Sequence, residues 1–270
     1  MMQIQDMNEE PRPGEHRGED GLIYCDQCGK PRQFRLPLTD PPKVVRCQCR
    51  CQQEQQAKQQ QELRMQEEMD RLDRLRSVSI LDPGLRGCTF EASRFDSKAL
   101  EIARRYVDTW PHEEQPELGL LFWGSVGTGK SYIASCIANA LVDRHIPVLM
   151  TSFSQILGEL PGPASGEQTA FLRKLNQHPL LILDDLGVER DTPYAMELVY
   201  SIIDARYRSG RPMILTTNLT MQELENPDSR EKARIYDRVL ERCTPVRVEG
   251  RNLRREKREA GRQVALKYLT

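Results

Sequence analysis

The residues at 124–131 have the types and spacing needed to hold the phosphates of a nucleotide, because they read G-x-x-x-x-G-K-S. Glycines let backbone N–H groups converge on phosphate oxygens, and the start of a following helix adds partial positive charge there. An apolar run at 118–123 leads into the loop, and a helix-like stretch at 132–144 follows it, as this motif requires. The expected phosphate-binding residues are Gly124, Ser125, Val126, Gly127, Thr128, Gly129, Lys130 and Ser131.

Two residues at the end of this loop would contact the phosphates and the metal ion. The Lys130 ammonium would reach the β- and γ-phosphates, and the Ser131 hydroxyl would hold Mg²⁺. The alternative is an ordinary glycine-rich turn between a strand and a helix, which the matching flanks disfavour. The pattern therefore indicates a site for a nucleoside triphosphate.

Polar side chains end two further apolar runs. Asp184 and Asp185 close the run that starts at Leu180, and Asn218 follows the run at 213–217. The carboxyl ends of buried parallel strands face the ligand in open α/β sheets. Asp184 would then hold Mg²⁺ through water, Asp185 would orient or activate the attacking water, and Asn218 would sense the γ-phosphate. An ordinary turn asparagine is the alternative for Asn218.

Five of the eight cysteines lie between positions 25 and 51, as a C-x-x-C pair followed by a second close group. This spacing is typical of a structural zinc site, in which thiolates bind Zn²⁺ tetrahedrally and fold a segment too small to bury a core. Four ligands are needed, so we favour Cys25, Cys28, Cys47 and Cys49, with Cys51 as the spare. Free or redox-active cysteines are the alternative.

Charge and hydropathy narrow the class of protein. The net charge of −1 does not by itself point to nucleic acid, although residues 230–270 are basic and would favour phosphate-bearing partners or form a solvated helix face. Residues 1–20 are acidic and polar, which predicts a disordered arm. No apolar run could span a membrane, and no signal peptide begins the sequence. We expect a cytoplasmic protein whose cysteines are reduced or metal-bound.

The chain divides into four stretches: the arm at 1–20, a cysteine unit with a linker helix at 21–80, a larger domain at 81–255 and a basic tail at 256–270. The linker helix is expected at 52–76 and a flexible loop at 161–166. Apolar runs alternate with helix-like stretches in the larger domain, so it should be α/β, with a parallel sheet flanked by helices. Its expected strands are 118–123, 146–150, 180–185, 213–218 and 246–248, and its expected helices are 97–110, 132–144, 151–160, 193–209 and 230–242.

The sequence resembles the DnaC/DnaI-type replicative helicase loaders, which are AAA+ ATPases related to the transposon helper IstB. The resemblance rests on G-S-V-G-T-G-K-S, then L-I-L-D-D-L-G, L-T-T-N and A-R-I-Y-D-R-V. The lead-in R-S-V-S-I-L-D-P-G-L-R-G-C-T-F and the N-terminal C-x-x-C…C-x-C also look like this family. In all, the resemblance covers about residues 22–255.

The resemblance implies an activity and a set of partners. It implies ATP hydrolysis at a site between neighbouring subunits, and therefore self-association of the chain. It also implies delivery of a DnaB-type hexameric helicase onto single-stranded DNA, with the zinc unit contacting the helicase. An IstB-like transposition helper is the alternative, which the zinc unit disfavours. A nucleic-acid-binding zinc protein with a degenerate nucleotide site is a third reading, which the complete set of Lys130, Asp184 and Asn218 disfavours.

The resemblance also assigns roles outside the two motifs. Arg238 matches the arginine finger, with Arg234 beside it, and Arg254 lies where the family carries an arginine after the last strand. Thr192 and Tyr194 match positions that contact single-stranded DNA, where a hydroxyl can bond a phosphate and a ring can stack on a base. The alternatives are a solvated arginine face and a helix cap at Thr192.

Two departures from the wider AAA+ pattern affect these expectations. Asp185 stands where many AAA+ proteins have glutamate and is one methylene shorter, so we expect slow hydrolysis. The sequence continues for only about 20 residues after the last expected strand, so we expect no helical lid.

Overall fold

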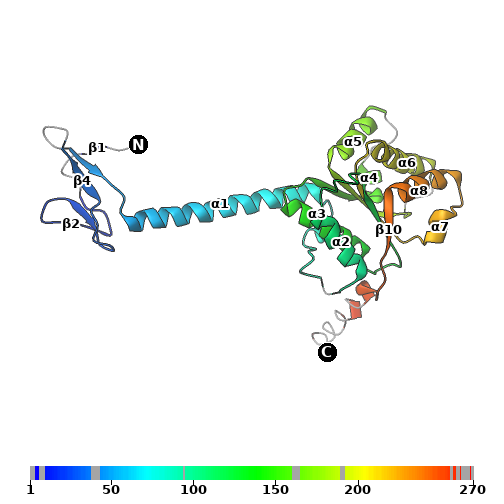
Figure 1. Ribbon diagram of the computed structural model, residues 1–270, viewed down its shortest axis with the longest axis horizontal. Helices are drawn as coiled ribbons and strands as arrows, with labels where there is room; N and C mark the ends of the chain where they lie inside the picture. Colours follow the sequence, from blue (N-terminus) through cyan, green and yellow to red (C-terminus); the bar gives the residue numbers. More distant parts are fainter. Residues whose placement is uncertain are drawn as a thin grey trace. The chain divides into compact units, whose positions relative to one another are not determined.

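The computed structural model divides the chain into two compact units, residues 1–70 and 71–270 (Figure 1). It describes all residues except those at 1–3, 6–9, 38–42, 94, 160–164, 189–191, 256–257, 260–261, 263–267 and 269–270. Most of the predicted basic tail therefore lies outside the described residues. Among the helices that the structure describes, none combines the length and apolar character needed to cross a membrane.

The first unit contains short antiparallel strands. Strand β5 pairs with β1 and β4, and β2 pairs with β3. Its buried apolar residues are few and include Ile23, Val44 and Val45. The strands are β1 (Ile4–Gln5), β2 (Glu15–Arg17), β3 (Ile23–Cys25), β4 (Gln33–Leu36) and β5 (Lys43–Arg46). A core of this size is too small to fold a unit without further stabilisation.

The prediction of a disordered arm at 1–20 is wrong for the part that the structure describes. Strand β2 pairs with β3 in register, with Glu15 opposite Cys25, and the Glu15 side chain is buried. Acidic composition predicts disorder only when the charges stay in water. Here arginines from distant positions surround the Glu15 carboxylate, which composition cannot reveal.

The predicted linker helix is confirmed and is longer than expected, because α1 spans Arg50–Ser79. Within the first unit its apolar side chains stay in solvent, and Leu63, Met65 and Met69 are each at least 60% exposed. Its last turn belongs to the second unit, where Arg76 forms an ion pair with Asp143. The run of helix-favouring Gln, Glu and Arg without Gly or Pro accounts for the length of this helix.

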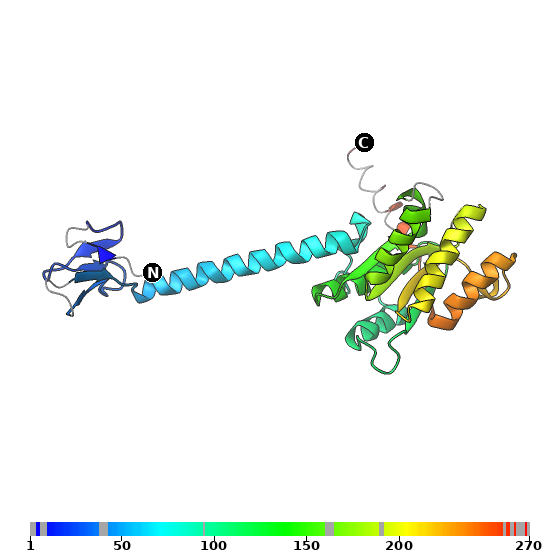
Figure 2. The ribbon, with the colours of Figure 1, turned by 90° about the horizontal axis from the view of Figure 1, so that it is seen from above.

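The second unit is built on a five-stranded parallel sheet, which confirms the predicted α/β fold (Figure 2). The strand order is β10-β6-β9-β8-β7. The strands are β6 (Gly119–Trp123), β7 (Val148–Ser152), β8 (Leu180–Leu186), β9 (Met213–Thr217) and β10 (Cys243–Arg247). Most of the residues in the first four are buried, as expected for strands covered on both faces.

Helices cover both faces of this sheet (Figure 1). Helices α2 and α3 contribute to one buried cluster, and α4 to α8 contribute to the other. The elements are η1 (Pro83–Leu85), α2 (Lys98–Asp108), α3 (Lys130–Asp143), α4 (Phe153–Glu159), α5 (Ser165–Gln177), α6 (Pro193–Arg208), α7 (Met221–Glu225) and α8 (Arg230–Arg242). Because helices cover both faces, the sheet is fixed in place, and it positions the loops that follow its strands at the carboxyl edge.

Several elements of the second unit differ from the sequence prediction. Residues 165–166 begin α5 instead of ending a loop, and the rest of that loop at 161–164 lies outside the described residues. Helices α5 and α7 were not expected, although Thr220 caps α7 in a reciprocal capping box. Strand β10 starts at Cys243, before the predicted start at 246, and so includes Pro245. An edge strand tolerates a proline because one of its sides makes no ladder hydrogen bonds.

A buried arginine joins the amino ends of two central strands. Arg206 on α6 is fully buried and donates to the carbonyl oxygens of His178, Pro179 and Pro212 at 2.6–3.1 Å. Burial lowers its pKa to about 10. The acceptors precede β8 and β9, so this side chain satisfies backbone groups where both strands enter the sheet.

We expect Arg206→Met to lower the free energy of unfolding of the second unit by about 3 kcal/mol, because several buried carbonyl groups lose their donor. Urea unfolding followed by tryptophan fluorescence reports on this unit, since both tryptophans, Trp110 and Trp123, lie in it. Arg105→Met, at an exposed position on α2, is the control. Equal stability of the two variants would contradict the role of Arg206.

Candidate functional site

The glycine-rich loop joins the end of β6 to the start of α3, so the predicted strand, loop and helix are confirmed. Gly124 has a φ of 144°, and a Cβ there would lie 2.5 Å from the carbonyl oxygen of Val248. Gly127 has a φ of 84°, and a Cβ there would lie 2.3 Å from Oδ1 of Asn252. Glycine is therefore required by backbone conformation and by the close approach of the C-terminal segment.

The Lys130 ammonium lies at the mouth of this loop. It donates to the carbonyl oxygens of Gly124 and Ser125, both at 2.8 Å, and to Oδ1 of Asn218 at 2.7 Å. Burial lowers the pKa of Lys130, while the Asp185 and Asp184 carboxylates act in the opposite direction. The structure thus brings together Lys130 and Asn218, which are 88 positions apart in the sequence.

The acidic residues lie on the neighbouring strand end. Oδ1 of Asp184 accepts a hydrogen bond from the Thr216 hydroxyl at 2.5 Å, and the same hydroxyl accepts one from the backbone N–H of Asp185 at 2.9 Å. Burial raises the pKa of Asp184, while hydrogen bonds from Thr216 and Ser131 act to lower it. A hydroxyl and a carboxylate, Ser131 and Asp184, therefore lie side by side, a donor set that suits Mg²⁺.

Strand β8 is distorted where it carries these carboxylates. Asp185 has a φ of 60°, in the left-handed region, and the register with β9 shifts between Leu183 and Leu186. Adjacent side chains of a regular strand point to opposite faces. The distortion lets both Asp184 and Asp185 line one cleft, together with Ser131. A conformation this uncommon for a non-glycine residue is typical of functional sites.

The cleft over the loop measures about 460 Å³ and has two walls that sequence motifs did not predict. One wall comes from Leu85 and Cys88, in the segment before α2, and the other from Leu253 and Arg254. Arg254 also contributes positive charge that lowers the pKa of Lys130. The resemblance had marked Arg254 only by its place after the last strand.

The segment that carries Arg254 is held on the loop by two hydrogen bonds. The backbone N–H of Leu253 donates to the carbonyl oxygen of Gly127 at 2.9 Å, and Nδ2 of Asn252 donates to that of Val126 at 3.1 Å. Of the residues after β10 that the structure describes, those at 253–255 form one helical turn. Sequence motifs could not predict that these residues line the cleft. Their place there depends on tertiary packing, which is set by where β10 leaves the sheet.

Arg238 is engaged within its own chain. Its Nη2 lies 2.9 Å from Oδ1 of Asp204 and 3.0 Å from the Tyr200 hydroxyl, to which it donates. Arg234 also donates to the Tyr200 hydroxyl at 3.2 Å, and its guanidinium lies 4.7 Å from the centre of that ring. The arginines of α8 thus pack on α6, whereas the alternative had predicted a solvated face of arginines. The role of Arg238 towards a neighbouring subunit stays a prediction.

Thr192 and Tyr194 lie at the start of α6. Thr192 caps the helix, because its hydroxyl accepts a hydrogen bond from the backbone N–H of Ala195 at 3.2 Å, which confirms the capping alternative. Tyr194 is half-buried, and its hydroxyl is buried with no partner among the described residues. Contact of this pair with DNA stays a prediction.

Four cysteine sulfurs of the first unit gather in one group, in which all lie within 4.8 Å of one another. They belong to Cys25, Cys28, Cys49 and Cys51. The inclusion of Cys47 as a ligand, with Cys51 as the spare, is therefore corrected. The Cys47 thiol instead donates to the carbonyl oxygen of Pro31 at 3.3 Å. Cys51 joins the group from the first turn of α1, a helix whose start the sequence placed two residues too late.

The group fits a tetrahedral metal. Zn–S bonds of about 2.3 Å place sulfurs roughly 3.8 Å apart, within the observed spread. A hydrogen bond from Arg32 lowers the pKa of Cys25 to about 6, whereas a hydrogen bond with Cys28 raises the pKa of Cys51 to about 11. Metal binding would therefore displace a proton from Cys51, and the affinity should fall as the pH falls.

Comparison with known proteins identifies the family of the chain. Residues 48–261 match the family of the IstB-like ATP binding protein. The chain belongs to this family. The replicative helicase loader DnaC of Escherichia coli is 28% identical over 180 residues, which cover 64% of this chain and 72% of DnaC. The replicative helicase loader DnaI of Bacillus subtilis is 26% identical over 149 residues, which cover 50% of this chain and 47% of DnaI.

Solved structures agree with this assignment. A crystal structure of DnaI matches with a TM-score of 0.55 at 26% identity, covering 67% of this chain and 99% of that chain. A crystal structure of the DnaC helicase loader matches with a TM-score of 0.51 at 23% identity, covering 62% and 99%, and so shows the same fold. This member of the IstB-like family is an AAA+ ATPase, and the predicted resemblance to DnaC/DnaI-type loaders is confirmed.

In this ATPase, Thr216→Val should lower ATP turnover by about 10–100-fold, the range for residues that orient a metal-binding carboxylate. Valine keeps the shape of the side chain but cannot bond Asp184 or Asp185. Phosphate release at saturating ATP measures turnover, and a fluorescent nucleotide measures binding, which should persist because the loop is intact. Thr244→Val, on an exposed position of β10, is the control. Unchanged turnover in Thr216→Val would rule out this function.

The cysteine group predicts which thiols retain zinc in the same chain. Cys51→Ser should lose the metal, whereas Cys47→Ser should keep one Zn²⁺ per chain. Of these two cysteines, Cys51 is the one whose sulfur belongs to the four-cysteine group. Metal analysis of carefully reduced full-length protein measures the zinc content. Retention of zinc by Cys51→Ser together with its loss from Cys47→Ser would restore the original ligand set.

Proposed function

We propose that this ATPase loads a DnaB-type hexameric helicase onto single-stranded DNA during replication initiation or restart. The observation that carries the proposal is the similarity to proteins named replicative helicase loaders, which extends over 72% of DnaC. The ATP site supports it, because the loop lysine, two strand-end carboxylates and an asparagine meet at one edge of the sheet. The IstB-like transposition role is not favoured, because relatives that match the chain include proteins named replicative helicase loaders, DnaC and DnaI.

Each residue of the ATP site has a proposed task. Lys130 binds the β- and γ-phosphates, and Asn218, which accepts its hydrogen bond here, senses the γ-phosphate. Ser131 and Asp184 hold Mg²⁺, which neutralises phosphate charge when bound. Asp185 orients the attacking water. Arg254 faces the same cleft and adds a positive charge within reach of the phosphates.

Arg238 is proposed to complete the ATP site of a neighbouring subunit. An arginine supplied in trans can accelerate hydrolysis by about 10³–10⁵-fold. In the single chain this guanidinium is paired with Asp204, so a neighbour's γ-phosphate would compete with that carboxylate. Hydrolysis should therefore depend on self-association.

The remaining roles concern the helicase and DNA. The cysteine unit, at residues 21–80 with its linker helix, is proposed to bind Zn²⁺ and contact the helicase. Thr192 and Tyr194 are proposed to contact single-stranded DNA. Because the Thr192 hydroxyl caps α6 and the Tyr194 hydroxyl is buried, the tyrosine ring is the better candidate for contact with a base.

A loading assay tests the proposal. A hexameric replicative helicase should displace a strand annealed to circular single-stranded DNA faster when this chain and ATP are added. A circle offers no end to thread, so the ring must be opened or assembled around it. Lys130→Ala should abolish the stimulation because ATP binding is lost. Equal stimulation by wild type and Lys130→Ala would refute ATP-dependent loading. A wild-type chain that neither stimulates nor retains the helicase would refute loading itself.

Mixed mutants test Arg238 in trans. Arg238→Ala should bind ATP but lose turnover, and Lys130→Ala should lose its own site while keeping its Arg238. Mixed together, the two inactive chains should regain part of the phosphate release at shared interfaces. Arg208→Ala, another arginine paired with Asp204, is the matched control and should retain activity. Co-assembly of the mutants without recovery at any ratio would leave Arg238 with a role in its own chain only.

A further inference from the structure

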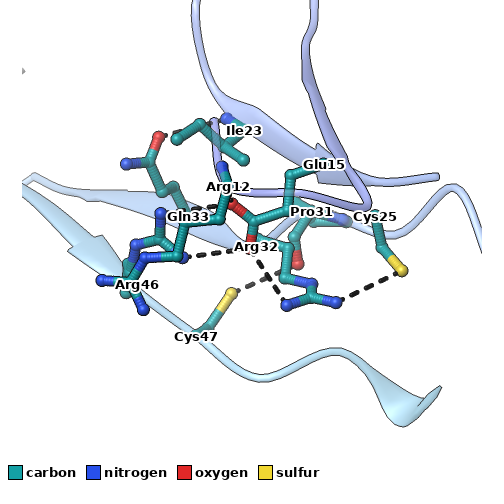
Figure 3. A network of polar contacts seen from close by, with 9 residues as sticks. All are labelled: Arg12, Glu15, Ile23, Cys25, Pro31, Arg32, Gln33, Arg46 and Cys47. Carbon is teal, nitrogen blue, oxygen red and sulfur yellow. Dashed lines mark hydrogen bonds and ion pairs between the residues drawn. The ribbon is translucent and has the colours of Figure 1, made fainter. Parts of the chain in front are cut away.

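Glu15 is a buried carboxylate held by donors from three residues of the first unit. Its side chain is only 2% exposed. Nη1 of Arg32 and Nη1 of Arg46 each donate to Oε1 at 3.0 Å, and Nη2 of Arg46 donates to Oε2 at 3.2 Å (Figure 3). The backbone N–H of Arg12 donates to Oε2 at 3.0 Å. A buried carboxylate is tolerated only when it is paired in this way, so its position is fixed.

Arg32 connects this carboxylate to the cysteine group. While its Nη1 is bound to Glu15, its Nη2 donates to Sγ of Cys25 at 3.5 Å (Figure 3). The Arg32 side chain is 12% exposed, so little water competes for these bonds. A guanidinium carries its N–H groups in a rigid plane. Fixing one nitrogen at Glu15 therefore aims the other at the sulfur.

We propose that Arg32 is a positioning residue of the four-cysteine metal site, and that Glu15 holds it in place. The inference rests on the proposed zinc site. Four thiolates around Zn²⁺ leave a net charge of about −2, and a guanidinium held against one sulfur offsets part of that charge. Arg32 thereby fixes the Cys25 sulfur and strengthens metal retention. Arg46 contributes indirectly, because it contacts Glu15 and holds that carboxylate against Arg32.

A purely structural role for this network makes a different prediction. Arg32 and Arg46 both bind Glu15, so Arg32 ties β2 to the segment just before β4 and Arg46 ties it to β5. If that were their whole function, replacing either one would affect metal binding equally. Arg32 donates to Cys25, a member of the group, whereas the hydrogen bonds of Arg46 described above go to Glu15, so the proposal requires a larger effect from Arg32.

The experiment compares Arg32→Met, Arg46→Met and the control Arg35→Met in the full-length protein. Arg35 lies on β4, three residues after Arg32, is exposed and donates to the carbonyl oxygen of Asp20. Competition with a chromophoric chelator measures Zn²⁺ affinity, and the sulfur-to-metal charge-transfer band of the Co²⁺-substituted protein reports on the thiolates. We expect Arg32→Met to bind Zn²⁺ about 10–100-fold more weakly and to shift the Co²⁺ band. Arg46→Met should have a smaller effect, and Arg35→Met none.

Equal Zn²⁺ affinity and an unchanged Co²⁺ spectrum in Arg32→Met would overturn the inference, and so would equal losses in Arg32→Met and Arg46→Met. If Arg32→Met does not fold, Glu15→Gln and Arg32→Lys decide. Glu15→Gln should weaken binding because Arg32 loses its charged anchor, and Arg32→Lys should keep part of the affinity because one donor remains; wild-type affinity in both would refute the positioning role. Failure of the wild-type protein to bind either metal would instead reject the zinc site itself.

Discussion

The ATP site depends on the position of β9 between the strand that leads into the glycine-rich loop and the strand that carries the aspartates. Because β9 is central, its end can contact both neighbours at once. Asn218, just beyond it, accepts from Lys130, and Thr216 within it binds Asp184 and the backbone of Asp185. One strand therefore sets the separation between the phosphate-binding lysine and the proposed metal-binding carboxylate. The distortion of β8 at Asp185 is stable because Thr216 satisfies the backbone N–H there.

The same sheet links the ATP site to the arginine face of α8. Helices α6 and α8 pack together on one face, with tyrosines of α6 between the arginines of α8. Cation–π contacts and the pair with Asp204 hold Arg238 in one orientation. Such interactions reduce the conformational freedom that an arginine loses when it binds a phosphate. The packing is thus compatible with a structural role and with a preorganised side chain.

The first unit must be stabilised in a different way, because its few buried apolar residues cannot stabilise it alone. Polar interactions and sulfurs take the place of a core. Glu15, Arg32 and Arg46 join segments that are distant in sequence, and the four-cysteine group joins β3 to the first turn of α1. In such a unit, the free energy of metal binding would also contribute to the free energy of folding. The buried carboxylate network also contacts the cysteine group directly, through the hydrogen bond from Arg32 to Cys25.

The sequence by itself determined the α/β class, most elements of the second unit, the linker helix and which residues to propose for the ATP site. These features depend on local signals: the glycine spacing of the loop, apolar strands that end in polar residues, and apolar runs that alternate with helices. Only the tertiary structure decided that Cys51 replaces Cys47, that Glu15 is buried, that Thr216 joins Asp184 and Asp185, and that Arg254 lines the cleft. Each of these depends on contacts between distant segments, whose geometry is set by strand order, by the start of a helix or by a distorted strand end, and no local pattern encodes it.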